Sequence, residues 1–332
     1  MQSQMLARCV LPFTAVLSAW WLFRQANKPK RIIQDEVVVV VGASSGVGLA
    51  VAKLYASLRQ AFGKKTIHIV ARSAGLAEVA REISSKSGCQ SVHAHTANAC
   101  SEEDLAELSQ KILRISGKID TLVFCAGALT TSGFLDLNAA RPGSASDAKH
   151  GPHASTVSGV AKASYDANVL SCMLTVAALV PLLQHATTPR IAVLSSVAAE
   201  IPAPTRSIYA AHKAALSMFL RCLRIELDSV PVGKLSPNAG KGIGISIIHP
   251  ASINTGLRSR ALDSSSSAGA TQEHESSAMT PEYVAEQVKK AIDLEVDEVW
   301  LPGLYWWVAK VGMVMAPEFI AKKAKRKYNW QV

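Results

Sequence analysis

The chain has 332 residues, of which 49% are hydrophobic and 18% are charged. This length allows one large α/β domain or two smaller domains, and the hydrophobic content excludes a chain that is disordered throughout. The formal net charge of +10 favours an acidic partner and leaves a nucleic acid, a membrane surface and a phosphorylated ligand open. The six cysteines are scattered, with no Cys-x-x-Cys pair and no histidine at ligand spacing, so neither a disulfide scaffold nor a metal site is expected.

An uncharged apolar run lies near the N-terminus, over residues 9–23, and it includes the pair Trp20 and Trp21. As a helix the apolar part would span about 22 Å, less than the ~30 Å hydrocarbon core, so it can anchor but only marginally span. No small-residue cleavage site follows it, which disfavours a cleaved signal peptide. Residues 1–35 are therefore predicted to be a membrane anchor and linker, with a helix packed on its own domain as the alternative. The basic flank, which by the positive-inside rule keeps the body of the protein in the cytosol, is Arg24, Lys28, Lys30 and Arg31.

Residues 36–301 alternate short β-branched runs with longer helical stretches. Runs that are apolar on both faces and separated by helices predict a doubly wound α/β fold, with a parallel sheet covered on both sides. The predicted strands are Val37–Val41, Thr66–Val70, Ser91–His95, Thr121–Cys125, Arg190–Ser195, Ile243–His249 and Glu298–Leu301. The predicted helices are Val47–Arg59, Leu76–Ser85, Glu102–Ile115, Ala161–Gln184, Ile208–Asp228 and Pro281–Leu294.

Two stretches without periodicity, Thr130–Ser158 and Ser259–Ser277, interrupt this alternation. Loops of this length in a compact domain are usually lids, insertions or disordered segments. The substrate pocket is expected to draw on the first stretch and on residues 252–279.

A Gly-rich turn follows the first strand directly and opens the first helix. The turn reads Gly42-Ala43-Ser44-Ser45-Gly46-Val47-Gly48. In this context Gly42 permits a tight turn, Gly46 lets the backbone approach a pyrophosphate and Gly48 lets the helix pack closely on the strand. The turn therefore predicts dinucleotide binding.

The end of the second strand indicates which dinucleotide is bound. The sequence there is Val70-Ala71-Arg72-Ser73, with no carboxylate to accept a hydrogen bond from a ribose 2′-hydroxyl. Because the Arg72 guanidinium can pair with a 2′-phosphate, NADP(H) is favoured over NAD(H).

Four polar residues form a candidate catalytic group. Tyr209 and Lys213 are four residues apart, so on a helix they share one face. Ser196 ends the fifth strand, at the edge of the sheet where such folds bind ligands. Asn168 lies inside the long preceding helix.

With these motifs in this order, the sequence resembles the short-chain dehydrogenase/reductase family over residues 36–301. The resemblance implies a single-domain Rossmann-type fold with a seven-stranded parallel sheet. It also implies cofactor contacts by Asn98, by Ala126 and Gly127 of the Cys125-Ala126-Gly127 segment, and by Pro250, Ile253 and Thr255. The turn residues Gly42, Ser44, Ser45, Gly46, Val47 and Gly48 with Arg72, and Tyr209 and Lys213 on the catalytic side, complete the expected cofactor set.

The sequence departs from the family pattern at four supporting positions. Val41 replaces the usual Thr, Asn98 the usual Asp, Cys125 the usual Asn and Ala251 the usual Gly. These changes touch cofactor or supporting positions and put cofactor binding in doubt. The four candidate catalytic residues are intact, which favours an enzyme.

The chemistry expected is proton transfer coupled to hydride transfer. Tyr209 would give the substrate oxygen a proton, although a free phenol has a pKa of about 10. Lys213, together with the positive charge of an oxidised nicotinamide, would lower that pKa. Ser196 would donate a hydrogen bond to the developing alkoxide, and Asn168 would position a water that connects Lys213 to solvent.

Residues 302–332 are expected to form a second membrane-associated segment. Apolar and aromatic residues between Trp300 and Met315 precede a cationic cluster, which suits an interface with anionic head groups, although part of the segment can be core or dimer surface. The cluster is Lys322, Lys323, Lys325, Arg326 and Lys327. Without its five charges and the four of the N-terminal flank the net charge is +1, so the basic excess belongs to the two ends of the chain.

The function expected is an NADPH-dependent reduction of a ketone, or oxidation of the alcohol, on a lipophilic substrate such as a steroid, a retinoid or a long-chain keto-lipid. The expected location is the endoplasmic reticulum membrane or a lipid droplet, with the domain facing the cytosol, as a possible homodimer formed through residues 161–184 and 208–228. The alternative is a non-catalytic NADPH-binding protein at the same surface. Nucleic acid is not an expected partner, because no strand interleaves basic and aromatic residues.

Overall fold

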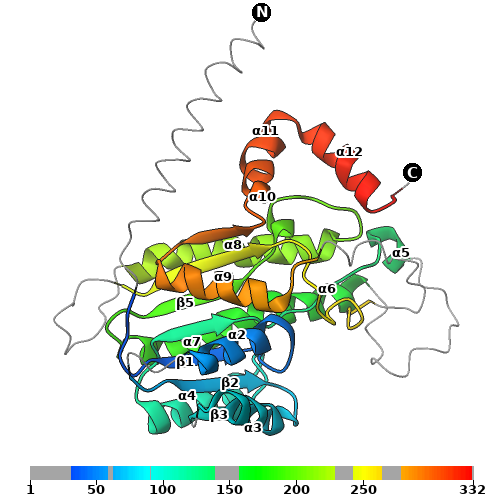
Figure 1. Cartoon of the computed structure of the whole chain (residues 1–332). Coiled ribbons are helices and arrows are strands. Elements are labelled where there is room, and N and C mark those ends of the chain that lie inside the picture. Colours follow the sequence, from blue (N-terminus) through cyan, green and yellow to red (C-terminus); the bar gives the residue numbers. More distant parts are fainter. Residues whose placement is uncertain are drawn as a thin grey trace, which may run out of the picture.

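The computed structural model describes residues 31–58, 63–89, 91–138, 157–228, 242–263 and 278–330. Within these residues seven strands form one all-parallel sheet in the order β3-β2-β1-β4-β5-β6-β7 (Figure 1). The strands are β1 (Val37–Val41), β2 (Thr66–Ala71), β3 (Val92–Thr96), β4 (Thr121–Phe124), β5 (Arg190–Leu194), β6 (Gly244–Pro250) and β7 (Glu298–Leu301). The predicted fold class is confirmed, and each strand boundary lies within one residue of its prediction. The direction of winding reverses between β1 and β4, which is where such folds bind ligands.

Helices cover both faces of the sheet. The β1 valines point alternately to the two sides and pack under these helices. Val38 and Val40 join the core under α2 (Gly46–Ser57), α3 (Leu76–Ser87) and α9 (Pro281–Asp293). Val39 and Val41 join the core under α4 (Glu102–Ser116), α7 (Ser171–Leu183) and α8 (Ser207–Asp228). All five β1 valines are buried, which is why this strand reads as an uninterrupted apolar run.

The helix predicted over Ala161–Gln184 begins earlier and is not uniform. It consists of α6 (Val157–Tyr165), a π-helical turn η2 (Asp166–Leu170) and α7. Among the described residues it is the one helix long and apolar enough to cross a membrane, with a mean hydropathy of 1.7. Half of its apolar window is buried inside the protein, and Val169, Cys172 and Leu179 belong to the core, so we interpret it as a core helix.

The first predicted loop contains a short helix that the sequence pattern missed, α5 (Phe134–Asn138). Residues 139–156 of this loop and 264–277 of the second loop lie outside the described residues. The described parts of the two loops are tied together at Asp263. Its carboxylate accepts hydrogen bonds from the backbone amides of Thr131, at 2.8 Å, and Ser132, at 2.7 Å.

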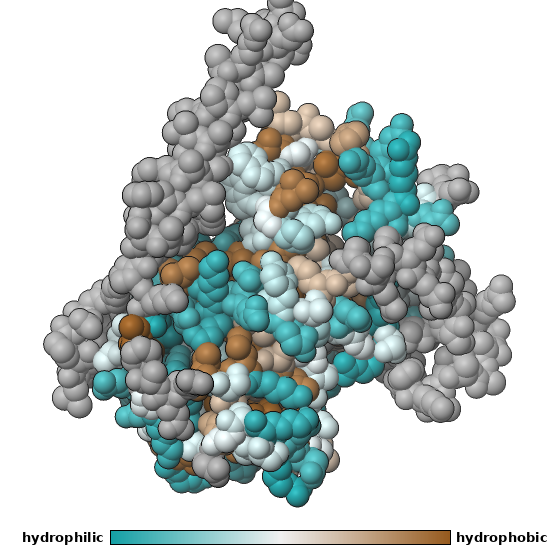
Figure 2. All heavy atoms as spheres, viewed as in Figure 1, coloured by the Kyte–Doolittle hydropathy of each residue, from teal (hydrophilic) through white to brown (hydrophobic). Residues whose placement is uncertain are grey.

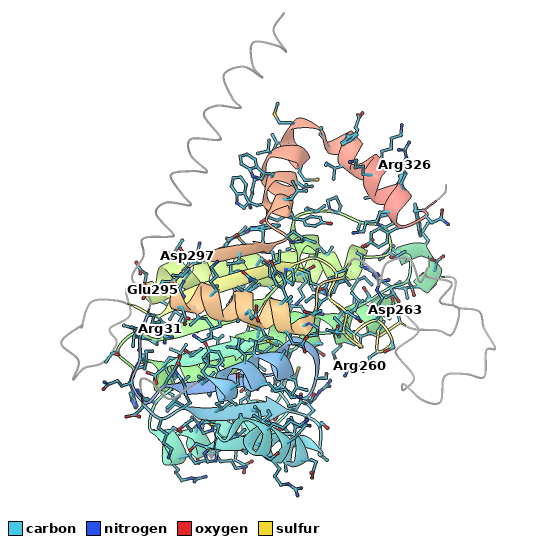
Figure 3. All side chains as sticks on the ribbon, viewed as in Figure 1. Arg31, Arg260, Asp263, Glu295, Asp297 and Arg326 are labelled. Atoms are coloured by element: carbon cyan, nitrogen blue, oxygen red, sulfur yellow. The ribbon has the colours of Figure 1, made fainter. Side chains whose placement is uncertain are left out.

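The predicted anchor lies outside the described residues as far as residue 30, but Arg31 does not behave as part of a free basic flank. Its side chain is 3% exposed and forms an ion pair with Glu36. Its guanidinium also donates to the carbonyl oxygens of Asp120, at 2.6 Å, and Thr188, at 2.7 Å. Figure 3 shows Arg31 at the opposite end of the sheet from Arg260 and Asp263. Arg31 therefore belongs to the folded domain, and counting it in the membrane flank was wrong.

The chain after β7 folds as a series of short helices. These are α10 (Leu304–Trp307), the π-helical η5 (Val308–Gly312), α11 (Met313–Met315) and α12 (Pro317–Lys327). Trp300 and Leu301, which we expected in the aromatic segment, are buried in β7, and the Trp300 ring stacks on His249 with centroids 4.2 Å apart. The apolar residues that are exposed come later: Leu304, Trp306, Val314, Met315 and Phe319.

Candidate active site

The Gly-rich turn is built by close backbone contacts. Gly42 has a φ of +84°, and a Cβ on it would lie 2.6 Å from the Ala126 amide nitrogen. A Cβ on Gly48 would lie 2.2 Å from the Gly42 carbonyl oxygen. Gly46 has a φ of +57°, and its Cβ would meet the Thr255 side chain at 3.3 Å. The turn thus lies against the segments after β4 and β6 at the start of α2. These close contacts leave room only for glycine at positions 42, 46 and 48.

The remaining predicted cofactor residues lie along the same carboxyl edge of the sheet. Pro250 ends β6, and Ile253 forms a bridge with Met279 just beyond it. Arg72 is exposed and follows β2 by one residue. Asn98 follows β3, where its side chain accepts a hydrogen bond from the Cys100 amide at 3.2 Å. This edge fits a dinucleotide, with a helix N-terminus, a glycine cradle and an exposed cation, Arg72, beside it.

Ser44, Ser45 and Val47 complete the turn, and a residue that we did not predict reaches it. Arg260, in the loop after β6, donates from Nη2 to the Ser45 hydroxyl at 3.2 Å and from Nε to the Gly256 carbonyl at 3.0 Å. The two residues are 215 positions apart, so no local spacing could have indicated this contact.

Ser196, Tyr209 and Lys213 meet at the end of β5. Tyr209 lies in the first turn of α8 and Lys213 one turn later, and both side chains are buried. The Ser196 hydroxyl lies near enough to the Tyr209 hydroxyl to lower its pKa, and the Ser196 oxygen accepts from the Ala198 amide at 3.1 Å. The Lys213 ammonium donates to the Leu194 carbonyl at 3.0 Å. The predicted group is therefore assembled around one strand end.

Asn168 joins this group through the loop after β4. It lies in the π-helical turn and is fully buried. Its Nδ2 donates to the carbonyl oxygens of Ala128 and Ser164, both at 2.9 Å, and its Oδ1 accepts from the Ala128 amide at 3.2 Å. A Cβ on Gly127 would lie 2.9 Å from Asn168 Oδ1 and 3.5 Å from Lys213 Nζ. The Asn168 amide thus holds the loop at Gly127 and Ala128 in place, and this loop lies between Asn168 and Lys213.

Burial dominates the protonation of both catalytic candidates. Burial raises the pKa of Tyr209, and the neighbouring Ser196 hydroxyl opposes this rise without cancelling it. Burial lowers the pKa of Lys213 to about 8. We expect Lys213 to lower the Tyr209 pKa together with the positive charge of an oxidised nicotinamide. Among the groups of the chain itself, Ser196 and Arg206 lower it, and burial outweighs them.

Two further residues adjoin the site. Arg206, three residues before Tyr209, is buried, and its Nη1 donates to the Thr130 carbonyl at 2.8 Å. Its guanidinium carbon also lies 5.5 Å from the ring centre of Tyr328, which follows α12. Helical spacing from Tyr209 could have indicated Arg206, whereas Tyr328 offers no such signal because it is more than a hundred residues away.

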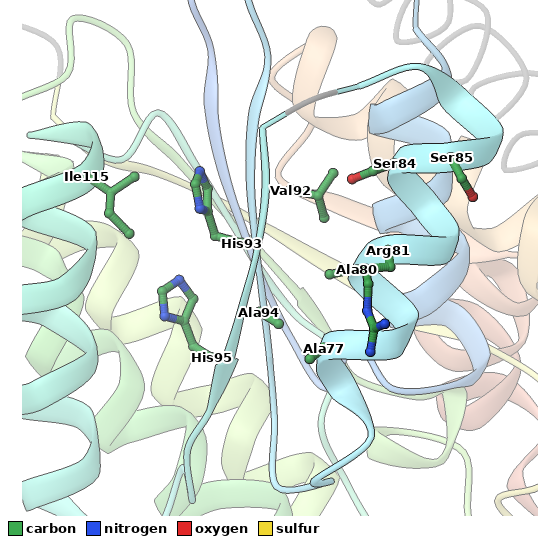
Figure 4. Close-up of a pocket in the computed structure, with 10 residues that line it drawn as sticks. All are labelled: Ala77, Ala80, Arg81, Ser84, Ser85, Val92, His93, Ala94, His95 and Ile115. Atoms are coloured by element: carbon green, nitrogen blue, oxygen red, sulfur yellow. The ribbon is translucent and has the colours of Figure 1, made fainter.

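A cavity of about 700 Å³ lies away from this site, along the edge strand β3, with α3 on one side of the strand and Ile115 of α4 on the other (Figure 4). His93 and His95 line it, and His95 hydrogen-bonds to the buried His68 at 2.9 Å. Burial lowers the pKa of His68 to about 3 and that of His95 to about 4. None of the predicted site residues lines this cavity, so we do not assign the active site to it.

A doubly wound sheet with a Gly-rich turn and a Ser-Tyr-Lys group at one edge defines a nucleotide-dependent oxidoreductase of the Rossmann type. The family model described as short chain dehydrogenase matches residues 36–265. Because this match covers more than half of the chain, the protein belongs to the short-chain dehydrogenase/reductase family, and it is an NAD(P)-binding oxidoreductase.

Similar proteins include two animal relatives of the same name. Dehydrogenase/reductase SDR family member 7B of Xenopus tropicalis is 27% identical over 303 residues, which cover 89% of this chain and 87% of the relative. The protein of that name from Danio rerio is 28% identical over 280 residues, covering 82% of this chain and 79% of the relative.

Two solved structures share the fold. An alcohol dehydrogenase from Thermococcus sibiricus, complexed with 5-hydroxy-NADP, has a TM-score of 0.60 at 20% identity and covers 80% of this chain and 96% of its own. A short-chain dehydrogenase from Shigella flexneri, complexed with NADP, has a TM-score of 0.61 at 19% identity and covers 82% of this chain and 98% of its own.

Proposed function

We propose that the protein is an NADP(H)-dependent oxidoreductase that reduces a ketone on a lipophilic substrate, or oxidises the corresponding alcohol with NADP. The observation that carries this proposal is the meeting of Ser196, Tyr209 and Lys213 beside the Gly-rich turn. A bound nicotinamide supplies the hydride that forms the new C–H bond. Tyr209 gives its phenolic proton to the carbonyl oxygen, and Ser196 holds that oxygen as negative charge develops on it.

Lys213 supports the proton transfer from its position one turn beyond Tyr209. Its ammonium is held by the Leu194 carbonyl, and its pKa of about 8 places its protonation equilibrium near neutral pH. A residue of this kind can both stabilise a phenolate and exchange a proton at the working pH.

NADP(H) is proposed as the cofactor because Arg72 is the charged group at the end of β2. The residues there, from Val70 to Ser73, contain no carboxylate that would bind a ribose 2′-hydroxyl and repel a 2′-phosphate. The exposed Arg72 side chain is free to form a charge-assisted hydrogen bond with that phosphate. Both solved structures named above were complexed with NADP or its hydroxylated derivative.

The experiment that tests catalysis is the substitution Tyr209→Phe. We expect the variant to bind NADPH within about threefold of wild type, since only a hydroxyl is lost, and to oxidise it with lipid ketones at least about a thousandfold more slowly. The measurements are fluorescence titration with NADPH and single-turnover NADPH oxidation. Wild-type protein that binds NADPH and never oxidises it with any ketone would instead identify the non-catalytic alternative.

A membrane surface is proposed as the second partner, with the endoplasmic reticulum or a lipid droplet as the location and the domain on the cytosolic side. Exposed apolar residues gather over α10 and α11, while α12 is hydrophilic and carries the cationic cluster (Figure 2). Val314 and Met315 are 75% and 71% exposed. Apolar residues beside lysines suit insertion among anionic head groups.

The membrane proposal is tested by hydrogen exchange of residues 304–327 with and without anionic vesicles. We expect the vesicles to protect this segment in the full chain, and Val314→Ser with Met315→Ser to abolish the protection. The matched control is Met218→Ser with Ile225→Ser, which removes exposed apolar residues from α8. If the control variant loses the protection and the first variant keeps it, the membrane surface is not α10–α12.

The α8 variant also tests the proposed homodimer. Met218 and Ile225 are 57% and 75% exposed on the helix through which we expect two copies to pair. We expect the variant to become monomeric at concentrations where the wild type is dimeric, as measured by light scattering in detergent. An unchanged mass would place the dimer elsewhere or show that there is none.

A further inference from the structure

A second cavity, of about 280 Å³, lies between three segments that are far apart in the sequence. Its lining comes from α5 and the residue before it, from the turn that leads into α8, and from the end of α12. The lining residues are Gly133, Phe134, Leu135, Pro204, Thr205, Ser207, Lys325 and Trp330. In Figure 1 the C-terminal end of α12 approaches α5 at this place. The lining is mostly apolar, and the volume is slightly below the range of complete small-molecule sites, so it suits one part of a ligand.

The cavity adjoins the catalytic group. Thr205 and Ser207, on its wall, flank Arg206, and Tyr209 follows within the same first turn of α8. Arg206 also holds the Thr130 carbonyl in the loop after β4. The chain that lines the cavity therefore runs directly into the turn that carries Tyr209, with the buried Arg206 between them.

The outer wall of the cavity is the C-terminal tail. After α12 the chain turns at Asn329, which has a φ of +47°, and the Trp330 amide donates back to the Lys325 carbonyl at 2.9 Å. This turn lays the Trp330 ring against Gly133, where a Cβ would lie 2.9 Å from the ring. Tyr328 is held by Arg206, whose guanidinium carbon lies 5.5 Å from the centre of the tyrosine ring.

We propose that this cavity is the subsite for the apolar, non-reacting part of the substrate, with Trp330 as its wall and the Arg206–Tyr328 contact holding that wall in place. The inference rests on the proposed function and names the subsite that the function requires. It gives the C-terminal segment a role inside the active site in addition to its outward-facing surface. Trp330 and Tyr328 are thus specificity residues rather than catalytic ones.

Two diketones with the same reacting head test the proposal, butane-2,3-dione and dodecane-2,3-dione. In Trp330→Ala the ratio of kcat/KM for the long to the short diketone should fall about tenfold, mainly through KM, because the chain loses an aromatic wall. Tyr328→Phe keeps the ring but removes the hydroxyl that interacts with the Arg206 guanidinium, and should lower the same ratio about threefold. The matched control is Tyr283→Ala, because Tyr283 is 43% exposed on α9, Trp330 is 40% exposed, and Tyr283 does not line the cavity.

A crosslinking measurement separates this inference from the proposed function. A dodecane-2,3-dione with a diazirine at its chain end, photolysed with full-length protein and NADP, should label residues 133–135, 204–207 and 325–330. Labelling there without turnover of any ketone would overturn the reductase and keep the subsite. Turnover with labelling elsewhere, or an equal change of both diketones in Trp330→Ala, would overturn the subsite and keep the reductase.

Discussion

The Gly-rich turn and the C-terminal segment both adjoin the candidate active site, but they are attached to the domain in different ways. The turn is held by contacts between backbone atoms, such as the approach of Gly48 to the Gly42 carbonyl. The C-terminal segment is held by side chains from distant parts of the chain, such as Glu200 with Lys310 and Arg206 with Tyr328. Backbone contacts tolerate almost no change of residue, whereas side-chain contacts can be weakened one at a time. The comparison predicts that substitutions in the first region act on folding and cofactor binding, and those in the second act on local opening and substrate choice.

The largest effect is expected from Gly48→Ala. A Cβ there would lie 2.2 Å from the Gly42 carbonyl oxygen, so the first turn of α2 must move away from β1. We expect a loss of about 3 kcal/mol in the free energy of unfolding and loss of NADPH binding, measured by urea denaturation and fluorescence titration. The control is Gly303→Ala, where no atom lies within 4 Å of the new Cβ and a change within about 0.5 kcal/mol is expected. Equal effects of the two would contradict the steric argument.

Lowering the pH should destabilise the folded protein through His68, which lies on the β2–β3 side of the sheet. Its pKa is about 3 in the folded protein, against a reference value of 6.5. The unfolded chain therefore takes up a proton below pH 6.5 that the folded chain refuses, and stability falls as the pH drops from 6.5 toward 3. Between pH 7 and pH 5 this one titration amounts to about 2 kcal/mol.

The test for His68 compares the urea unfolding of His68→Gln with that of wild type at the two pH values. In the wild type the free energy of unfolding should fall between pH 7 and pH 5. We expect this fall to be about 2 kcal/mol smaller in the variant, and the remaining fall to come from other groups. His185→Gln replaces an exposed histidine and should keep the wild-type difference. A full wild-type difference in His68→Gln would show that another group carries the acid sensitivity.

Arg72→Gln separates cofactor choice from cofactor binding. Loss of one charge-assisted hydrogen bond to the 2′-phosphate should weaken NADPH binding about tenfold and leave NADH binding unchanged. Isothermal titration with both cofactors is the measurement. Arg81→Gln, which removes an exposed arginine from α3, is the control for charge alone. A parallel loss of affinity for both cofactors would show that Arg72 does not read the 2′-phosphate.

The smallest effect is expected from Glu200→Gln in the C-terminal attachment. Glu200 pairs with Arg221 of α8 and Lys310 of η5. Because these pairs are partly exposed, we expect the free energy of local opening of the C-terminal segment to fall by only about 1 kcal/mol. This would be measured as faster hydrogen exchange in residues 304–316, with a nearly unchanged melting temperature. Glu82→Gln also breaks contacts with two lysines, Lys53 and Lys86, and should leave that exchange unchanged. Slower exchange, or an equal change in both variants, would contradict this attachment.

The two regions also differ in how much of them could be predicted. The glycines, the buried valine run and the four-residue spacing of Tyr209 and Lys213 are local features, and each predicted an element that the structure contains. Arg31 could not be placed because its partners, Asp120 and Thr188, are brought to it only by the assembled sheet. We expected Trp300 in the surface segment. Its burial could not be predicted, because its ring stacks on His249 only once β6 pairs with β7. Charge and aromatic content alone do not say which side of a strand faces the core.

The π-helical turn at residues 166–170 makes Asn168 depend on a count of residues as well as on their identity. A π turn holds one residue more than an α turn, and each residue rotates an α-helix by about 100°. Insertion or deletion of a single residue between α6 and α7 therefore changes the phase of everything that follows. The amide that binds Ala128 and the apolar face of α7 that packs on the sheet are in phase only at the present length.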